Sequence, residues 1–388
     1  MAKSMKSILL FKLCSKIEHG TLTVKTPDGD IQHFGDGLPK AEVSIHDWAM
    51  LDAVLQRGDI GLGESYVEGF WDSPNVEDFL TILINNQHLA HTQSRGNQFQ
   101  NLLFRFTNVF MRRNSRAGSS KNIQAHYDVG NEFYKLWLDE TMSYSSGLYE
   151  TQDETLKDAQ HNKYDRLISM LPKTAENVLE IGCGWGGFAE RAADQGRNVT
   201  GITISPAQYE YSKQRLGSRS NIELRDYRDI DQKYDSIVSI EMIEAVGENY
   251  WREYFRKIKD SLADGGRAAI QAIIVEDSAF ERYRSQSDFI RQYIFPGGML
   301  IPPMAIKKFA KEANLSVHNM HRFGVDYART LREWLDGLNG AQAQIEQQGY
   351  GQKFLRSWRY YMHFCAAGFQ HGKIINVAQF SLAHAQES

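Results

Sequence analysis

Residues 177–187 read Asn-Val-Leu-Glu-Ile-Gly-Cys-Gly-Trp-Gly-Gly and predict a buried strand, a tight turn and the start of a helix. Glycine stands at the alternate positions Gly182, Gly184 and Gly186. Because glycine has no Cβ, such a turn bends sharply and lets a ligand come close to the backbone. The segment therefore predicts a ligand site at the carboxyl end of a strand.

Two classes of ligand fit this turn. Glu180, two residues before the first glycine, can bind a cationic amino group, which suits S-adenosylmethionine with its ammonium, ribose and sulfonium. Gly182, Gly184 and Gly187 also satisfy the pattern G-x-G-x-x-G, which is typical of dinucleotide sites. The turn alone leaves both classes open.

Strands and helices are expected to alternate around the turn, which predicts a doubly wound, mostly parallel α/β sheet. The expected strands are 178–181, 198–204, 222–225, 234–240 and 267–274, and the expected helices are 187–195, 206–216 and 250–262. Ligands of such sheets bind outside the carboxyl ends of the strands, where the glycine turn is expected to lie.

The residues after the second and third strands favour S-adenosylmethionine. A dinucleotide site usually has an acidic residue about 20 positions after the glycines, and the segment 201–208 has none. Thr203, Ile204 and Gln208 lie there instead, where hydroxyl and amide groups can bind the ribose. Tyr227 and Arg228 follow the third strand, where an adenine can lie against an aromatic ring.

Composition excludes several classes of protein. The chain has 388 residues, enough for two domains, with 42% hydrophobic and 24% charged residues and a net charge of -4. This charge gives no global attraction to nucleic acid, and no nucleic-acid partner is expected. Three scattered cysteines form no disulfide framework and no metal cluster, and no signal peptide or membrane span is predicted.

Residues 1–115 predict a small mixed α/β domain. The turn Pro27-Asp28-Gly29-Asp30 separates short expected strands at 21–24 and 31–34, and a helix at 46–56 is expected to be broken at 61–66. Residues 122–388 form the second domain. Within it, residues from about 280 to 388 are rich in aromatic side chains and mostly helical in pattern, and are expected to cap the sheet and enclose a pocket.

The segment 91–121 is basic and amphipathic. It contains Arg and Lys residues and no acidic residue, and apolar side chains recur at helical spacing from Phe99 to Phe110. One interpretation is an interfacial helix on an anionic membrane. The other is a linker helix packed on its own protein, and the sequence leaves both open.

Several motifs, in order from about residue 45 to 380, resemble the cyclopropane fatty-acyl-phospholipid synthase family. Besides the glycine turn and 201–208, they are Ile123–Asn131, Leu138-Asp139, Tyr144-Ser145-Ser146, Tyr293–Gly298, Phe323–Tyr327 and Cys365–Phe369. The resemblance implies a class I methyltransferase sheet with a helical C-terminal cap and a small N-terminal α/β domain.

The resemblance implies methylene transfer from S-adenosylmethionine to a cis double bond of a phospholipid acyl chain, which forms a cyclopropane ring. In the family the alkene attacks the sulfonium methyl, a cation develops on the chain, and a base removes a proton. A bound bicarbonate ion is that base. Such chemistry needs a dry, apolar pocket whose aromatic rings stabilise the cation. The candidates are Tyr293, Phe295, Trp334, Trp358, Tyr360, Tyr361, Phe364 and Phe369.

The family's ion site is only partly matched. Glu244 and Tyr327 match its glutamate and tyrosine, and Ile273 matches a lining position. Ser146 replaces the usual cysteine, Ala245 a histidine and Gln271 another histidine. Serine, glutamine and backbone amides can still donate to an oxyanion, but the titratable imidazole is lost. These changes bear on the product, which is a methyl- or methylene-branched chain or a furan precursor if the base is moved.

Other residues were assigned from the same resemblance. Tyr144 and Ser145 are expected to touch the methionine end of the cofactor. Cys365 matches a cysteine of the family's active site, but the mechanism needs no thiolate, so its expected role is to line the pocket. Glu241 can be confused with Glu244, and we favour Glu244 because it matches the family glutamate and lies beyond the expected strand end, where ligands bind.

The expected partners are a membrane phospholipid with unsaturated chains and an anionic membrane surface. The expected location is cytoplasmic, at the inner face of the membrane, and a homodimer is left open. The sequence leaves two alternatives to a lipid methyltransferase open. One is an oxidoreductase that uses the same glycine turn, and the other is a membrane-binding module without activity.

Overall fold

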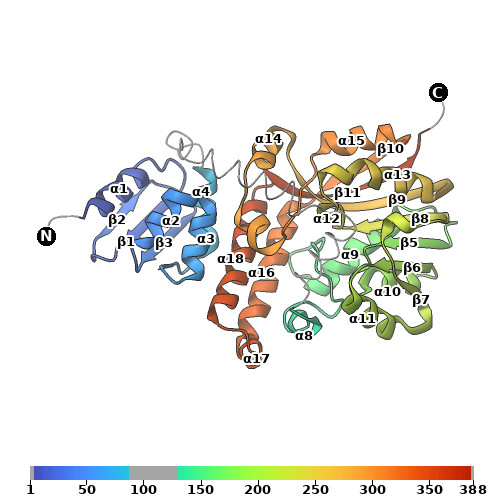
Figure 1. Cartoon of the computed structure of the whole chain (residues 1–388), viewed down its shortest axis with the longest axis horizontal. Coiled ribbons are helices and arrows are strands. Elements are labelled where there is room, and N and C mark those ends of the chain that lie inside the picture. The colour runs from blue at the N-terminus through green and yellow to red at the C-terminus, as the bar shows by residue number, and fades with distance from the viewer. Residues whose placement is uncertain (1–3, 87–128, 386–388) are drawn as a thin grey trace.

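The computed structural model describes residues 4–86 and 129–385. The basic segment 91–121 and the expected domain boundary at 115–122 lie outside these residues. Figure 1 shows an N-terminal α/β module, a pair of long helices beside it, and a large sheet covered by helices. Among the described residues, no helix is long and apolar enough to span a bilayer.

The N-terminal module is a small sheet with helices packed on it. The strand order is β2-β1-β3-β4, in which β1 and β3 are parallel. Its strands are β1 (Thr21–Lys25), β2 (Ile31–Phe34), β3 (Lys40–Ile45) and β4 (Trp71–Asp72), and its helices are α1 (Met5–Cys14), α2 (Ala49–Arg57), α3 (Asp59–Val67) and α4 (Val76–Asn85). The strands expected at 21–24 and 31–34 are confirmed, while β3 was not predicted.

The expected helix break at 61–66 is wrong. The chain breaks at Gly58, which has φ of +62°, and Gly61 and Gly63 lie inside α3. These two glycines serve close packing instead. A Cβ at Gly61 would lie 2.0 Å from the Ala53 carbonyl oxygen, and one at Gly63 would lie 2.3 Å from the Phe289 ring. Glycine in a helix can mark a close approach as well as a break.

The large sheet has seven strands in the order β10-β11-β9-β8-β5-β6-β7. The five strands β9, β8, β5, β6 and β7 are parallel to one another, whereas β11 is antiparallel to both β9 and β10. Their bounds are β5 (Asn177–Ile181), β6 (Asn198–Thr203), β7 (Ser220–Leu224), β8 (Tyr234–Ile240), β9 (Leu262–Val275), β10 (Leu315–Arg322) and β11 (Ile375–His384). The doubly wound sheet predicted from the alternating pattern is confirmed.

The expectation that residues 280–388 are mostly helical misses β10 and β11. Strand β11 is buried along most of its length although it contains Gln379 and Ser381, both with 0% exposure. These polar residues interrupt the apolar run by which a buried strand is recognised in a sequence.

Helices cover both faces of the large sheet (Figure 1). In the described part of the chain after the N-terminal module, the helices of eight or more residues are α9 (Leu156–Ser169), α10 (Gly187–Asp194), α11 (Pro206–Leu216), α13 (Trp251–Ser261), α14 (Asp277–Ser285), α15 (Pro303–Glu312), α16 (Gly324–Gly340) and α18 (Gln352–Phe369). The shorter ones are α8 (Asn131–Tyr134), α12 (Ile243–Val246) and α17 (Gln342–Gln347). Helix α11 has the bounds expected from the sequence, since Ser205 caps it and Pro206 occupies its first turn.

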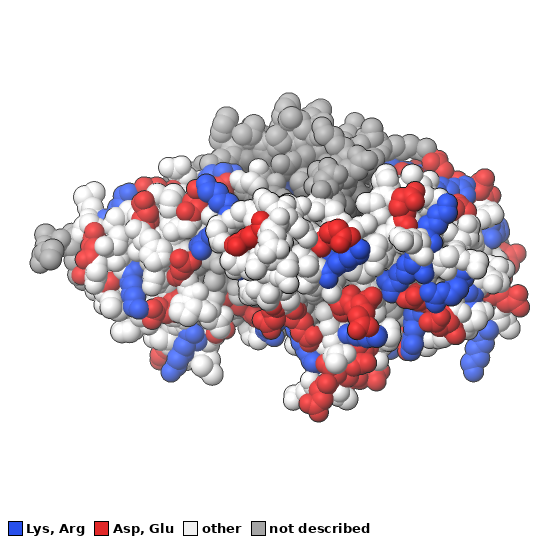
Figure 2. All heavy atoms as spheres, turned by 90° about the horizontal axis from the view of Figure 1, so that it is seen from below, with Lys and Arg blue, Asp and Glu red and all other residues white. Residues whose placement is uncertain are grey.

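Helices α16 and α18 lie side by side between the N-terminal module and the large sheet (Figure 1). Helix α18 packs on α3 and α4, and Arg332 of α16 forms an ion pair with Glu77 of α4. The N-terminal module is therefore joined to the helices that cap the sheet. On the face drawn in Figure 2, acidic and basic side chains are interspersed rather than gathered by sign.

Candidate active site

The glycine turn lies where the sequence predicted it, between β5 and α10. Gly182, Gly184 and Gly186 all have positive φ, from 52° to 85°, which only glycine adopts without strain. A Cβ built on Gly184 would meet no atom within 4 Å, so this glycine opens onto free space. By contrast, a Cβ on Gly186 would press on Leu216, 2.9 Å away. Gly186 therefore serves the turn and the helix start rather than direct contact with a ligand.

One cavity of about 540 Å³ begins at this turn and runs along the carboxyl ends of the strands toward α16 and α18. It is lined by ten of the eleven residues predicted to bind the cofactor, all except Gly186: Tyr144, Ser145, Glu180, Gly182, Gly184, Thr203, Ile204, Gln208, Tyr227 and Arg228. The structure therefore brings together residues that lie up to 84 positions apart in the chain, as between Tyr144 and Arg228.

Glu180 places an unpaired carboxylate oxygen at the cavity. The residue is 3% exposed, and within the described part of the chain its Oε2 is buried without a hydrogen-bond partner. Burial raises the pKa of Glu180 well above its usual value, and the nearby Lys163 lowers it. A cationic amino group is the partner that such an oxygen lacks, so the residue fits the ammonium of S-adenosylmethionine.

The cavity also has side chains that suit the ribose and the adenine of S-adenosylmethionine. Thr203 Oγ1 donates to Gln208 Oε1 at 2.9 Å, which holds both side chains at the cavity wall. Arg228 is held by Asp226, with Nη2 to Oδ2 at 2.6 Å, and its guanidinium lies 5.6 Å from the centre of the Tyr227 ring. A planar base can stack on such a surface of ring and guanidinium.

The other end of the cavity is apolar and aromatic. Of the eight aromatic residues proposed for cation stabilisation, four line it, namely Phe295, Tyr361, Phe364 and Phe369. Tyr144 also lies here, and its hydroxyl donates to that of Tyr361 at 3.0 Å. The other four do not line the cavity, namely Tyr293, Trp334, Trp358 and Tyr360. Of these, Tyr293 is 46% exposed and donates to Glu64 of the N-terminal module.

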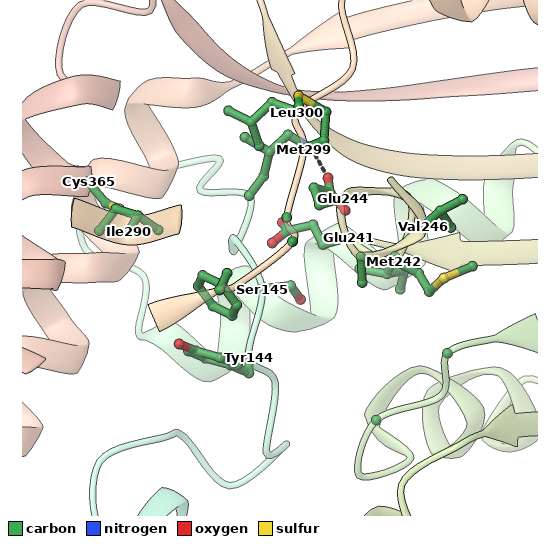
Figure 3. A pocket seen from close by; sticks show the side chains of 18 of the residues that line it. Tyr144, Ser145, Glu241, Met242, Glu244, Val246, Ile290, Met299, Leu300 and Cys365 are labelled. Carbon is green, nitrogen blue, oxygen red and sulfur yellow. Dashed lines mark hydrogen bonds between the residues drawn. The ribbon is translucent and has the colours of Figure 1, made fainter. Parts of the chain in front are cut away.

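Two glutamates stand at the middle of the cavity, at the end of β8 (Figure 3). Glu244 accepts the N–H of Ile273, and its Oε2 is buried with no partner among the described residues. Burial, with the charge of Glu241, raises the pKa of Glu244 to about 8. Glu244 is therefore mostly protonated at neutral pH.

Tyr327, Ser146 and Gln271, which the sequence grouped with Glu244, contact Glu241 instead. Tyr327 Oη donates to Glu241 Oε2 at 2.7 Å, while the Ser146 N–H and Gln271 Nε2 donate to Oε1 at 3.0 and 2.7 Å. Ser146 and Gln271 do not line the cavity but lie behind Glu241. The preference for Glu244 rested on its match to the family glutamate and on its place beyond the strand. A sequence does not show which of two nearby carboxylates faces the donors.

Lys163 is a buried charge that the sequence did not point to. It lies on α9 with 0% exposure, and its Nζ donates to Ser145 Oγ at 2.7 Å and also to Gln160. Burial lowers the pKa of Lys163 to about 8, against the opposing effects of Glu241, Asp139 and Glu180. A lysine in an amphipathic helix usually faces water, so nothing in the sequence indicated that Lys163 is buried.

Cys365 lies on α18 and lines the cavity, as expected. Burial raises the pKa of its thiol far above the ordinary value, so the thiol stays protonated at neutral pH. Ile273 also lines the cavity and contributes its N–H to Glu244. Both residues therefore shape the site, in keeping with a mechanism that needs no thiolate.

Comparisons with known proteins agree with this geometry. The family described as mycolic acid cyclopropane synthetase matches residues 114–380. The tuberculostearic acid methyltransferase UfaA1 of Mycobacterium tuberculosis is 34% identical over 86% of this chain and 81% of its own length. The cyclopropane-fatty-acyl-phospholipid synthase of Escherichia coli K12 is 30% identical over 86% of both chains. The solved cyclopropane synthase MmaA2 of M. tuberculosis superposes with a TM-score of 0.64, at 26% identity over 68% of this chain and 98% of its own.

The fold and the cavity thus define a class I S-adenosylmethionine-dependent methyltransferase. Within that class the chain belongs to the mycolic acid cyclopropane synthetase family, whose members include lipid methyltransferases and cyclopropane synthases. The resemblance seen in the sequence is confirmed, and the dinucleotide alternative for the glycine turn does not hold.

Proposed function

We propose that this protein transfers a methylene group from S-adenosylmethionine to the cis double bond of an unsaturated phospholipid acyl chain and forms a cyclopropane fatty acid. One observation carries the proposal. A single cavity joins the glycine turn, the buried carboxyl pair Glu241–Glu244 and an aromatic, apolar end. Methyl donor, proton acceptor and acyl chain would therefore meet in one cavity.

S-adenosylmethionine supplies an electrophilic methyl group on its sulfonium. Residues that line the cavity would hold it in parts: Glu180 would bind the ammonium, Thr203 and Gln208 the ribose, and Tyr227 with Arg228 the adenine. Trp185 Nε1 donates to Asn131 Oδ1 at 2.8 Å, which ties the glycine turn to α8. When both substrates are bound in fixed positions, the methyl group and the alkene can react without further loss of translational and rotational entropy.

The aromatic end serves the alkene and the cation that follows from its attack. Aromatic ring faces attract a cation, and here Phe295, Tyr361 and Phe369 surround the space next to the carboxyl pair. Tyr327 packs on Phe369 with ring centres 4.5 Å apart, and this contact holds the two rings together in the wall of the cavity. Exclusion of water prevents its addition to the cation, so that loss of a proton becomes the main outcome.

A second product class has its own support. Ala245 and Gln271 stand where the family usually has histidines, and UfaA1, at 34% identity, is named a tuberculostearic acid methyltransferase. A methyl- or methylene-branched chain, or a furan-precursor chain, is therefore the second candidate. Both candidates share methyl transfer to the alkene and differ in how the cation loses its proton.

The phospholipid form of the substrate rests on the E. coli relative, which is named for it. We extend the proposal to peripheral association with an anionic membrane at the cytoplasmic face. The arginine-rich segment 91–121 is the candidate contact, and it lies outside the described residues.

We expect purified protein to transfer label from S-adenosylmethionine, labelled at the methyl carbon, into the acyl chains of liposomes with cis-unsaturated phospholipid. Matched liposomes of saturated phospholipid should remain unlabelled, because a saturated chain has no π electrons to attack the methyl. Mass spectrometry of the released fatty acids measures the result. No label in any unsaturated chain, or equal label in saturated chains, would contradict the proposal.

A further inference from the structure

The carboxylate of Glu241 occupies a pocket built of hydrogen-bond donors. Its Oε1 accepts from the Ser146 N–H and from Gln271 Nε2, and its Oε2 accepts from Tyr327 Oη, at 2.7–3.0 Å. These are the groups that the sequence analysis assigned to a bound bicarbonate ion. Figure 3 shows Glu241 between Glu244 and the Tyr144–Ser145 segment, with its side chain directed into the cavity.

The orientation of Gln271 is fixed by its neighbours. Gln379 Nε2 donates to the Lys163 carbonyl oxygen and to Gln271 Oε1, at 3.2 and 2.9 Å. Because a carbonyl only accepts, this fixes the Gln379 amide, and Gln271 must then turn its own Nε2 toward Glu241. The amide nitrogen of Gln271 thus donates to Glu241 Oε1 at 2.7 Å and, more weakly, to the Ser146 carbonyl oxygen at 3.4 Å.

The backbone also directs Glu241 to this place. It has φ of +49°, an uncommon value for a residue other than glycine, and its N–H donates to the Gln271 carbonyl oxygen at 2.8 Å. Such backbone geometry is often found at functional sites. A glycine here would adopt the same φ easily and would leave the three donors facing an empty space.

The groups around Glu241 and Glu244 favour a pair in which only one of the two carboxyl groups is ionised. Burial is the largest effect and raises the pKa of Glu241 above its usual value, while its three donors and Lys163 oppose the rise. Glu244 has the Ile273 N–H for one oxygen, no partner for the other among the described residues, and a pKa of about 8. Three donors converge on Glu241 and one on Glu244, so the hydrogen bonds favour Glu241 as the charged member of the pair, as in other sites where two carboxyl groups have different environments.

A bicarbonate ion does not fit beside this arrangement. It would need the donors that Glu241 already uses, and it would bring a second negative charge next to a buried carboxylate. We propose that the Glu241 carboxylate itself is the resident general base of this site and takes the position of an exogenous anion. The proposal rests on the function proposed above and names the group that completes the reaction.

The proton balance is simple. After methyl transfer the acyl chain bears a cation next to the new methyl-bearing carbon. Glu241 takes a proton from that methyl group, and the electron pair of the broken C–H bond closes the third side of the ring. The chain becomes neutral, Glu241 becomes a carboxylic acid, and the proton passes to water when product leaves.

The test compares Glu241→Gln, Glu241→Gly and the wild type, with Glu210→Gln as a control on the exposed surface of α11. Glutamine keeps the size of the side chain but cannot accept the proton. Glu241→Gln should therefore lower methylene transfer by about 100-fold or more. S-adenosylhomocysteine affinity should stay within about threefold of wild type, as in the control, which separates loss of the base from loss of the fold.

Bicarbonate provides a second, independent measurement. Wild-type activity should not change when carbon dioxide is removed from the buffer, and ¹³C-bicarbonate should show no saturable binding by NMR. Glu241→Gly should bind ¹³C-bicarbonate at the freed donors and recover activity when it is added. Wild-type dependence on bicarbonate, wild-type binding of it, or an active Glu241→Gln would overturn the proposal.

The two proposals can fail separately. If the wild type labels no acyl chain, the proposed function fails, while the NMR measurement still decides whether Glu241 or an ion occupies the donors. If the wild type labels acyl chains and needs bicarbonate, only the assignment of Glu241 fails.

Discussion

Replacing Glu180 by glutamine should weaken the binding of S-adenosylhomocysteine, which keeps the ammonium of the cofactor, by about 100-fold. The Glu180 carboxylate is buried at the glycine turn and has an oxygen with no partner among the described residues. Removing one member of a buried charge pair costs about 2–5 kcal/mol, and each 1.4 kcal/mol is a factor of ten in affinity. Isothermal titration calorimetry measures the change directly.

Glu176→Gln is the matched control, because Glu176 precedes the same strand and is exposed. Its affinity should equal that of the wild type. A Glu180→Gln protein that is folded, as judged by its melting temperature, and binds as tightly as the control would show that Glu180 does not bind the ammonium.

Replacing Gly63 by valine should lower the free energy of unfolding by about 3 kcal/mol. A Cβ at this position would lie 2.3 Å from the Phe289 ring and 2.7 Å from the ring of Tyr360, which is fully buried on α18. The added side chain must therefore push α3 away from α18, through which the N-terminal module joins the rest of the protein. Urea unfolding measures the loss.

Gly340→Ala serves as the comparison for this variant. Gly340 ends α16 with negative φ, and a Cβ there meets no atom within 4 Å. Its stability should be unchanged or slightly higher. Equal stability of Gly63→Val and the wild type would contradict the close packing of α3 on α18.

The doubly wound part of the fold was predictable because its elements carry local signals. Ser205 and Pro206 mark the start of α11, and the apolar run before Gly182 marks β5. Strand β11 was missed because the polar residues Gln379 and Ser381 are buried in it, and Gln379 bonds to Gln271, which is distant in the sequence. Strand β10 was missed because only Leu315 is buried along it, so it has no clear apolar pattern. Gly61 and Gly63 were misread because close packing and helix breaking favour the same residue.

The cofactor end of the site was predicted better than the reaction centre. Glu180, Gly184 and Gln208 belong to short motifs whose spacing reflects one strand and its turn. The choice between Glu241 and Glu244 depends on a positive φ and on donors from three other parts of the chain. Such convergence becomes visible only when the sheet is assembled. Lys163 was missed for the same reason, since nothing in the sequence of α9 shows that it is buried.

The central claim is that the carbon of a sulfonium methyl group becomes the ring carbon of a cyclopropane fatty acid. The most direct test uses S-adenosylmethionine with a fully deuterated methyl group and liposomes of a cis-unsaturated phospholipid. NMR and mass spectrometry of the fatty acids should show a cyclopropane whose methylene carbon keeps two of the three deuterons, with no alkene left. A deuterated methyl or methylene branch would assign the second product class, and the absence of deuterium from the chain would contradict the claim altogether.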